Sequence, residues 1–168
     1  MPEVVLVSKA VDTEIELILN LIDQAFDGRA WHGTNLKGSL RGMTAAEAAW
    51  RPAEGRHNAW EVAIHCAYWK YTVWRRLTGM KRGLLPLKGS NWFARPSDGS
   101  DLEAAWKADI ALLALMHSQL REAAAGLRAK DLLTIPKGSR VTNTAILTGI
   151  AAHDLYHAGQ IQLLKRLH

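Results

Sequence analysis

The chain has little cysteine and no long apolar run. Cys66 is the only cysteine among 168 residues, which excludes an intrachain disulfide and a metal site built from several thiolates. We expect Cys66 to be a small core residue of a cytoplasmic protein, because free thiols are typical of a reducing compartment. No apolar run reaches the roughly 20 residues that cross a membrane. Glu3 stands where a signal peptide would carry positive charge, so we expect neither export nor a membrane partner.

Acidic residues are in the minority. The chain has 21 Lys and Arg against 16 Asp and Glu, which gives a net charge of +5 and raises the question of nucleic acid. The basic residues are scattered, however, and the longest basic clusters are pairs such as Arg75-Arg76 and Lys81-Arg82. A nucleic-acid binder more often shows a basic stripe along one helix or a recognisable module. We therefore predict a solvated basic surface and no nucleic-acid partner.

Convincing strand patterns are missing as well, and four long amphipathic segments dominate the chain. In the first segment, apolar residues recur at helical spacings of three and four: Val11, Ile15, Ile18, Ile22 and Phe26. The helices that we predict cover residues 9–27, 58–78, 101–125 and 142–167. Two long connections separate the first helix from the second and the third from the fourth. The pattern predicts a single all-α domain over residues 1–168, a four-helix bundle with crossover connections.

Short signals mark where helices begin and end. Residues 44–47, 58–61 and 100–103 each have the spacing of a capping box, in which a side chain and a Glu satisfy each other's backbone donors. We expect the box at 44–47 to open a short helix that Pro52 stops. Residues 80–99 are rich in proline and glycine and should form a long surface loop. Loops of this length inside a compact domain are often functional.

Two histidines lie one helical turn apart in the last predicted helix. His153 and His157 share a stripe with Gln160, because residues three and four apart lie on one helix face. Burying two imidazoles together is costly unless their nitrogens are satisfied, and a metal ion does this. His65, in the second helix, is the candidate for a third ligand. Two hydrogen-bonded core histidines remain the alternative. The interval between them lacks the Glu of the H-E-x-x-H pattern, which argues against a zincin-type protease.

Several segments carry the pattern of a known family. They are Trp31-His-Gly33, the stretch 57–69 with His65, the residues Trp92 and Trp106, and the most specific run, H-D-x-Y-H-x-G-Q at 153–160. Through these segments nearly the whole chain resembles the DinB/YfiT-like superfamily. The resemblance implies a four-helix bundle with a crossed connection, often dimeric. It also implies a divalent metal bound by one histidine of the second helix and two of the fourth, which are His65, His153 and His157 here.

Three neutral imidazoles would leave a coordination position of the metal open, as in catalytic rather than structural zinc sites. A water or thiol bound there would be deprotonated near neutral pH. The resemblance implies thiol-dependent transferases or isomerases that use low-molecular-weight thiols such as bacillithiol or mycothiol, and also hydrolases. We therefore expect zinc first, and nickel second, to activate a thiol or water for attack on a small electrophile. The alternative is a metal-containing small-molecule binding or stress-response protein without turnover.

The remaining site candidates are less specific, and no general acid or base can be identified. Gln160 could bond a substrate or a metal-bound water, or satisfy an interior polar position. His32 could approach the pocket or have only a structural role in its loop, as a loop or capping residue. Trp92 could line the pocket from the long loop. Asp154 lies about 100° away from the histidine stripe, so we expect it at the helix surface or around the ligands. The expected partners are a small-molecule substrate and a second copy of the chain.

Overall fold

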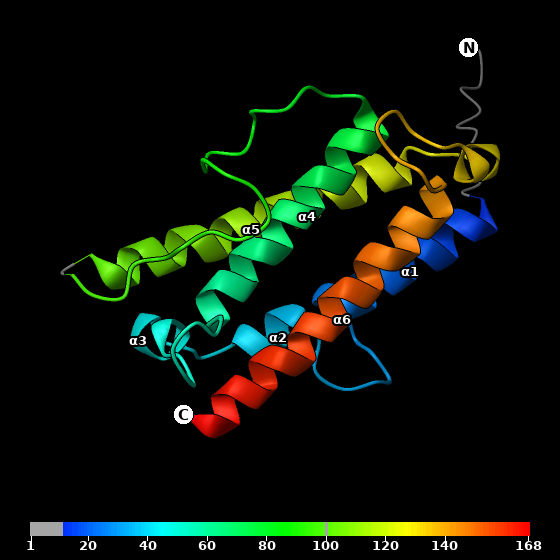
Figure 1. The fold of residues 1–168 in the computed structure, drawn as a ribbon. Helices are drawn as coiled ribbons and strands as arrows, with labels where there is room; N and C mark the ends of the chain where they lie inside the picture. Colours follow the sequence, from blue (N-terminus) through cyan, green and yellow to red (C-terminus); the bar gives the residue numbers. More distant parts are fainter. Residues whose placement is uncertain (1–11, 100) are drawn as a thin grey trace, which may run out of the picture.

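The computed structural model describes residues 12–99 and 101–168, and these residues form only helices, turns and loops (Figure 1). The predicted all-α class is confirmed. Four long helices make the bundle: α1 (Thr13–Phe26), α4 (Ala59–Thr78), α5 (Leu102–Ala125) and α6 (Asn143–Leu167). Three short elements lie in the connections: α2 (Leu36–Leu40), α3 (Ala45–Ala49) and the 3-10 helix η1 (Ala129–Leu133). No helix in this part of the chain is long and apolar enough to cross a membrane.

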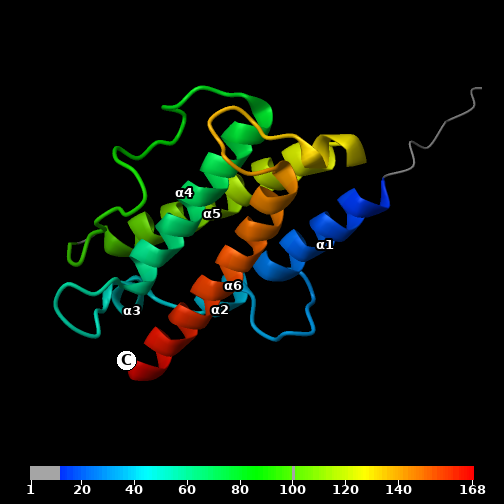
Figure 2. The ribbon, with the colours of Figure 1, turned by 45° about the vertical axis from the view of Figure 1, so that its right-hand side comes forward.

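The two long connections cross the bundle. Helix α4 packs against α5 and α6, and α1 packs against the same two helices (Figures 1 and 2). The chain therefore passes from α1 to α4 through α2 and α3, and from α5 to α6 through η1, without joining direct neighbours. This is the crossover arrangement that the sequence predicts. Because α4 and α6 are neighbours, residues on their facing sides can form one site.

The bounds of the long helices follow local signals. Helix α4 begins after Asn58, whose side chain accepts a hydrogen bond from the Glu61 N–H at 2.8 Å, and it ends at Gly79. Gly79 has a φ of 70°, the left-handed conformation in which glycine commonly ends a helix. Helix α6 begins after Thr142, whose hydroxyl accepts from the backbone of the first turn. Helix α1 begins at Thr13; residues 9–11 of the predicted first helix lie outside the described residues.

The three predicted capping boxes, at residues 44–47, 58–61 and 100–103, differ in the structure. At the start of α3, Thr44 and Glu47 form the complete reciprocal box. At the start of α4 only half of the box is present, because the Glu61 carboxylate binds Arg51 instead of the backbone. The third signal depends on Ser100, which lies outside the described residues, and the Glu103 carboxylate accepts from the backbone of α3. A carboxylate at a helix N-terminus is favourable in either helix, so the spacing alone does not show which helix it stabilises.

Helix α2 was not predicted, because its sequence Leu-Lys-Gly-Ser-Leu contains a glycine and reads as part of the linker. Asn35 begins it, accepting from the Gly38 N–H at 2.9 Å through its side chain. Leu36 and Leu40 then point into the bundle and are buried. Burial of two leucines, each contributing about 2 kcal/mol, outweighs the cost of one helical glycine.

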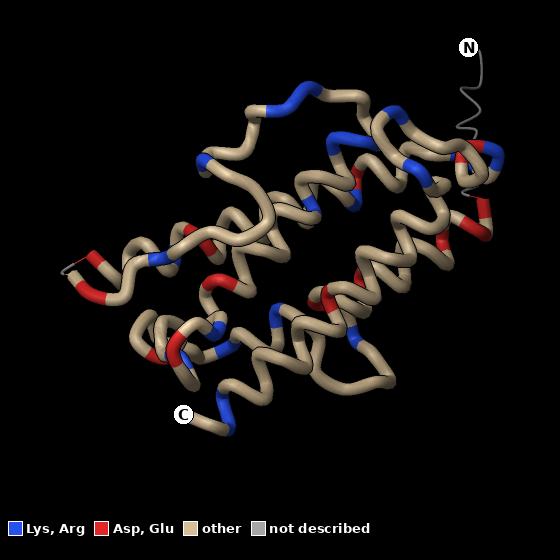
Figure 3. Tube along the Cα trace, in the orientation of Figure 1, with Lys and Arg blue, Asp and Glu red and all other residues tan. Residues whose placement is uncertain are grey.

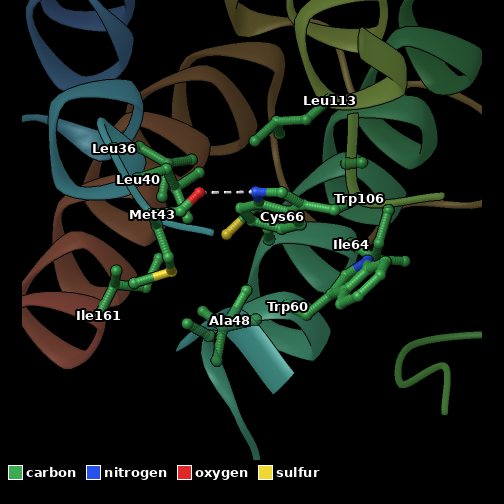
Figure 4. Close-up of a cluster of buried hydrophobic side chains, with 14 of the residues drawn as sticks. Leu36, Leu40, Met43, Ala48, Trp60, Ile64, Cys66, Trp106, Leu113 and Ile161 are labelled. Carbon is green, nitrogen blue, oxygen red and sulfur yellow. Dashed lines mark hydrogen bonds between the residues drawn. The ribbon is translucent and has the colours of Figure 1, made fainter. Parts of the chain in front are cut away.

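The core around the start of α4 is shown in Figure 4. Leu36, Leu40 and Met43 pack from the first connection against Trp106 of α5, whose indole N–H donates to the Met43 carbonyl at 2.9 Å. Cys66 lies among these side chains and is fully buried, as predicted. Burial raises the pKa of the Cys66 thiol well above its ordinary value, so it stays protonated. This cysteine is therefore part of the packing.

Candidate metal centre

Three histidines meet between α4 and α6. The Nε2 atoms of His65 and His153 are 3.1 Å apart, and those of His153 and His157 are also 3.1 Å apart. His65 and His157 are buried and His153 is half-buried. The helical spacing of His153 and His157 puts them on one face of α6, and that face is turned toward α4. The structure thus brings together the three residues that the sequence singled out, as a group that could hold a metal ion.

The hydrogen-bond partners of two histidines determine which nitrogen carries the proton. Nδ1 of His65 faces the backbone carbonyl of Asn91 at 2.9 Å, and Nδ1 of His157 faces Oε1 of Gln160 at 2.7 Å. Both partners are oxygen acceptors, so each Nδ1 carries the hydrogen and donates it. The Nε2 atoms of His65 and His157 consequently present lone pairs. Such partners orient the ring and fix the tautomer in many metal sites.

Two lone pairs directed at one point need a positive partner. If Nε2 of His153 carried a hydrogen, it could bond well to only one of its two neighbours, and the other lone pair would remain unsatisfied. If it did not, three lone pairs would face one another. A divalent cation satisfies all three nitrogens, and imidazole is a common ligand of zinc, nickel and copper. The donor set therefore fits a metal ion.

Burial keeps these imidazoles neutral. Burial, with smaller contributions from the nearby imidazoles of His157 and His57, lowers the pKa of His65 to about 4 despite its hydrogen bond to the Asn91 carbonyl. Burial likewise lowers the pKa of His153 to about 3, and that of His157 despite its hydrogen bond to Gln160. Neutral imidazole is the form that binds metals, so the three ligands need lose no proton near neutral pH.

The long loop after α4 completes the surroundings of His65. Trp92 is stacked between two imidazoles, with its ring 3.9 Å from that of His65 and 3.7 Å from that of His57. Its neighbour Asn91 has a φ of 65° and accepts from the Trp69 indole at 3.0 Å through its side chain. Sequence reasoning expected a functional loop but did not find Asn91. The signal was available, because asparagine tolerates the left-handed conformation better than most residues.

A pocket of about 480 Å³ opens beside His157. Most of its wall is apolar and comes from Pro52, Ala53, Val62, Trp92, Leu163 and Leu164, with Tyr156 beside them. Arg56, His57 and Gln160 supply its polar groups. Trp92 and Gln160 thus lie at the pocket, whereas the structure does not bring His32 there. His32 is exposed in the loop after α1 and does not line this pocket.

Asp154 lies behind the histidines. Its carboxylate accepts from the ammonium of Lys70 on α4, and each side chain is 1% exposed. The expected surface position is wrong: the direction 100° from the histidine stripe points into the bundle. Asp154 also lies near Cys66 and His153 as a second group of ligand-type atoms. Lys70 already neutralises the carboxylate there, so we assign Asp154 to the ion pair.

The fold and the histidines define the class, an all-α bundle with inward-facing ligand-type side chains on two neighbouring helices. A family model described as the DinB superfamily matches residues 30–161, and the chain belongs to that superfamily. The resemblance drawn from the sequence is confirmed at this level. Neither the curated proteins nor the solved structures contain a match to this chain.

Proposed function

We propose that the protein binds a divalent metal through His65, His153 and His157, with zinc the first candidate and nickel the second. One observation carries the proposal: two imidazole lone pairs, fixed by Asn91 and Gln160, are directed at the third imidazole. The DinB superfamily membership supports it.

The proposed activity is that of a metal-dependent thiol S-transferase or hydrolase. When bound, the ion supplies Lewis acidity that favours the deprotonated form of a thiol or water. Trp92 and Leu163 of the apolar pocket would hold the body of a small electrophile next to His157. Arg56 would attract a negative group of the substrate at the same pocket. A low-molecular-weight thiol, held reduced in the cytoplasm, is the proposed second substrate.

A second candidate is a metal-containing small-molecule binding protein without turnover. The chemistry of the pocket wall favours it: none of the described residues that line the pocket is a carboxylic acid. His57 is there, but its ring is stacked on Trp92 and its Nδ1 lies 2.9 Å from the Glu61 carboxylate. A pocket with so few groups for proton transfer suits binding as well as catalysis.

A homodimer is proposed as the working assembly. Leu17 and Leu21 lie one turn apart on the outer side of α1 and are 61% and 50% exposed. Such an apolar pair favours contact with a second copy. Sedimentation equilibrium of the protein and of Leu17→Glu would test this: the wild type should be dimeric, and a monomeric wild type would contradict it.

Metal analysis of untagged protein tests the metal proposal. We expect about one equivalent of metal in the wild type and much less in His157→Ala. His32→Ala is the matched control, because it removes an exposed histidine outside the site and should leave the metal content unchanged. Equal, near-zero metal in the wild type and His157→Ala would overturn the proposal.

Turnover separates the two candidate functions. Metal-loaded protein would be incubated with a thiol and an electrophile such as monobromobimane, and separately with p-nitrophenyl esters. An S-transferase consumes thiol catalytically, a hydrolase releases nitrophenol, and His157→Ala abolishes either. Saturable binding of the same compounds without turnover would favour the binding protein instead.

A further inference from the structure

A second pocket, of about 210 Å³, lies where the end of α4 meets the long loop. It shares no lining residue with the apolar pocket beside His157. Three arginines line it: Arg75 and Arg76 from the last turn of α4, and Arg82 from the loop. The sequence shows two separate basic pairs, and only the fold gathers these side chains around one space.

None of the three arginines has an ion-pair partner within residues 12–99 and 101–168. Nε of Arg76 is buried and lacks any hydrogen-bond partner there. A buried guanidinium nitrogen without a partner is costly, and a bound anion would remove that cost. Arg75 and Arg76 also complement the negative C-terminal end of α4, but Arg82 lies beyond the helix and is not explained in this way.

The residues that line the pocket include no carboxylate that could compete with a ligand. No Asp or Glu occurs in residues 62–97, which supply the whole wall. In Figure 3 the first part of the long loop after α4 carries blue segments, and red appears only at its far end, next to α5. The site is therefore locally positive.

Other polar groups are available beside the arginines. The Tyr71 hydroxyl accepts from the backbone N–H groups of Gly83 and Leu84, at 3.1 and 3.3 Å. A hydroxyl that accepts these bonds still has its own hydrogen to donate. Ser90 also lines the pocket. Tyr68, Leu85 and Leu87 supply apolar parts of the wall, and Thr72 adds a further hydroxyl.

We propose that this pocket binds a small phosphate monoester, with the phosphate between Arg75, Arg76 and Arg82 and a small apolar body against Leu85 and Leu87. Guanidinium groups match phosphate oxygens in geometry as well as charge, which makes arginine the common residue for this recognition. The wall offers both hydrogen-bond donors and apolar surface. A ligand with a phosphate at one end and a small apolar group at the other fits both.

Phenyl phosphate is a suitable probe. Isothermal titration of the protein in a low-salt chloride buffer should show saturable binding of one equivalent. Inorganic phosphate should compete more weakly, and benzyl alcohol should not bind. Arg82→Gln should weaken binding about tenfold, the usual loss for one charge-assisted hydrogen bond. Arg82 is exposed on the loop, so the variant should fold, and circular dichroism checks this.

Lys88→Gln is the matched control, because Lys88 lies on the same loop, is exposed and does not line the pocket. It should bind phenyl phosphate as the wild type does. The Trp69 indole N–H resonance, assigned with Trp69→Phe, gives a local readout because Trp69 lines the pocket. Three results would each overturn the proposal: no saturable binding, equal weakening by Lys88→Gln and Arg82→Gln, or an oligonucleotide that binds more tightly and displaces phenyl phosphate.

Discussion

The ammonium of Lys70 and the carboxylate of Asp154 pair in the interior of the bundle, where neither side chain is more than 1% exposed. The pair joins α4 to α6, the two helices that carry the three histidines, and Asp154 directly follows His153. The Lys70 Nζ also lies 3.3 Å from Nδ1 of His117 and 4.8 Å from the centre of the Phe26 ring. Removing one member of such a pair leaves the other as an uncompensated buried charge.

Lys70→Met should therefore lower the free energy of unfolding by about 3–5 kcal/mol, as measured by urea denaturation. Lys70→Met/Asp154→Leu removes both charges and should recover most of that loss. A Lys70→Met protein as stable as the wild type would contradict the importance of the pair.

Gln160 should act on the metal through His157. Its Oε1 accepts from Nδ1 of that ring, so Gln160→Ala leaves the ring free to rotate and its tautomer unset. Loss of such a partner typically costs 10–100-fold in metal affinity. Competition titration with zinc and a chelator would measure the change.

Gln162→Ala provides the control for that titration. Gln162 lies two residues further along α6 and makes no hydrogen bond to the histidines. Its zinc affinity should equal that of the wild type. A similar loss in both variants would point to a general effect on α6.

Asn91 should show the cost of a left-handed residue next to the site. Asn91→Gly keeps the backbone carbonyl that accepts from His65 and adopts a φ of 65° without strain. Asn91→Ala also removes the asparagine amide group, but it keeps a Cβ atom. A Cβ in this left-handed conformation costs about 1 kcal/mol. Thermal unfolding should rank Asn91→Ala below Asn91→Gly. The reverse order would show that the backbone conformation does not limit stability here.

His117 should make the protein sensitive to mild acid. Burial lowers its pKa to about 3, and the Lys70 ammonium adds to that effect. In the unfolded chain the ring takes up a proton near pH 6.5, so between about pH 6.5 and 3 the unfolded state binds more protons. The stability associated with neutral His117 is therefore present above pH 6.5 and is lost as the pH falls.

Urea denaturation at pH 7 and pH 5, in the presence of a chelator, would measure this loss. His117→Gln should lose less stability than the wild type between these two pH values, by up to about 2 kcal/mol. His117→Gln is expected to be less stable at pH 7, so the comparison rests on the pH dependence of each protein. Parallel pH dependences would contradict the assignment.

The sequence predicts the long helices well, because their apolar residues recur at helical spacing and their ends carry caps such as Asn58 and Gly79. The pairing of His153 and His157 on one face also follows from helical spacing alone. The sequence offers His65 only as a candidate third ligand, which the family resemblance supports, because spacing along one helix says nothing about a ligand on another.

Other features depend on contacts between elements and were out of reach. The angle between Asp154 and the histidines does not show whether the Asp154 side chain faces solvent or a neighbouring helix. Its burial depends on Lys70, which is distant in sequence. Helix α2 is stabilised by the burial of Leu36 and Leu40, which its local sequence does not show. The gathering of Arg82 with the end of α4 likewise depends on the path of the loop.

The three histidines come from two helices that are far apart along the chain: 88 residues separate His65 from His153. An ion held by both would join these positions much as a disulfide does. Because the unfolded chain has no such preformed site, the ion would favour the folded state by its binding free energy, which grows with the concentration of free metal. In a chain with a single cysteine, a cross-link through imidazoles is one that reducing conditions would leave intact.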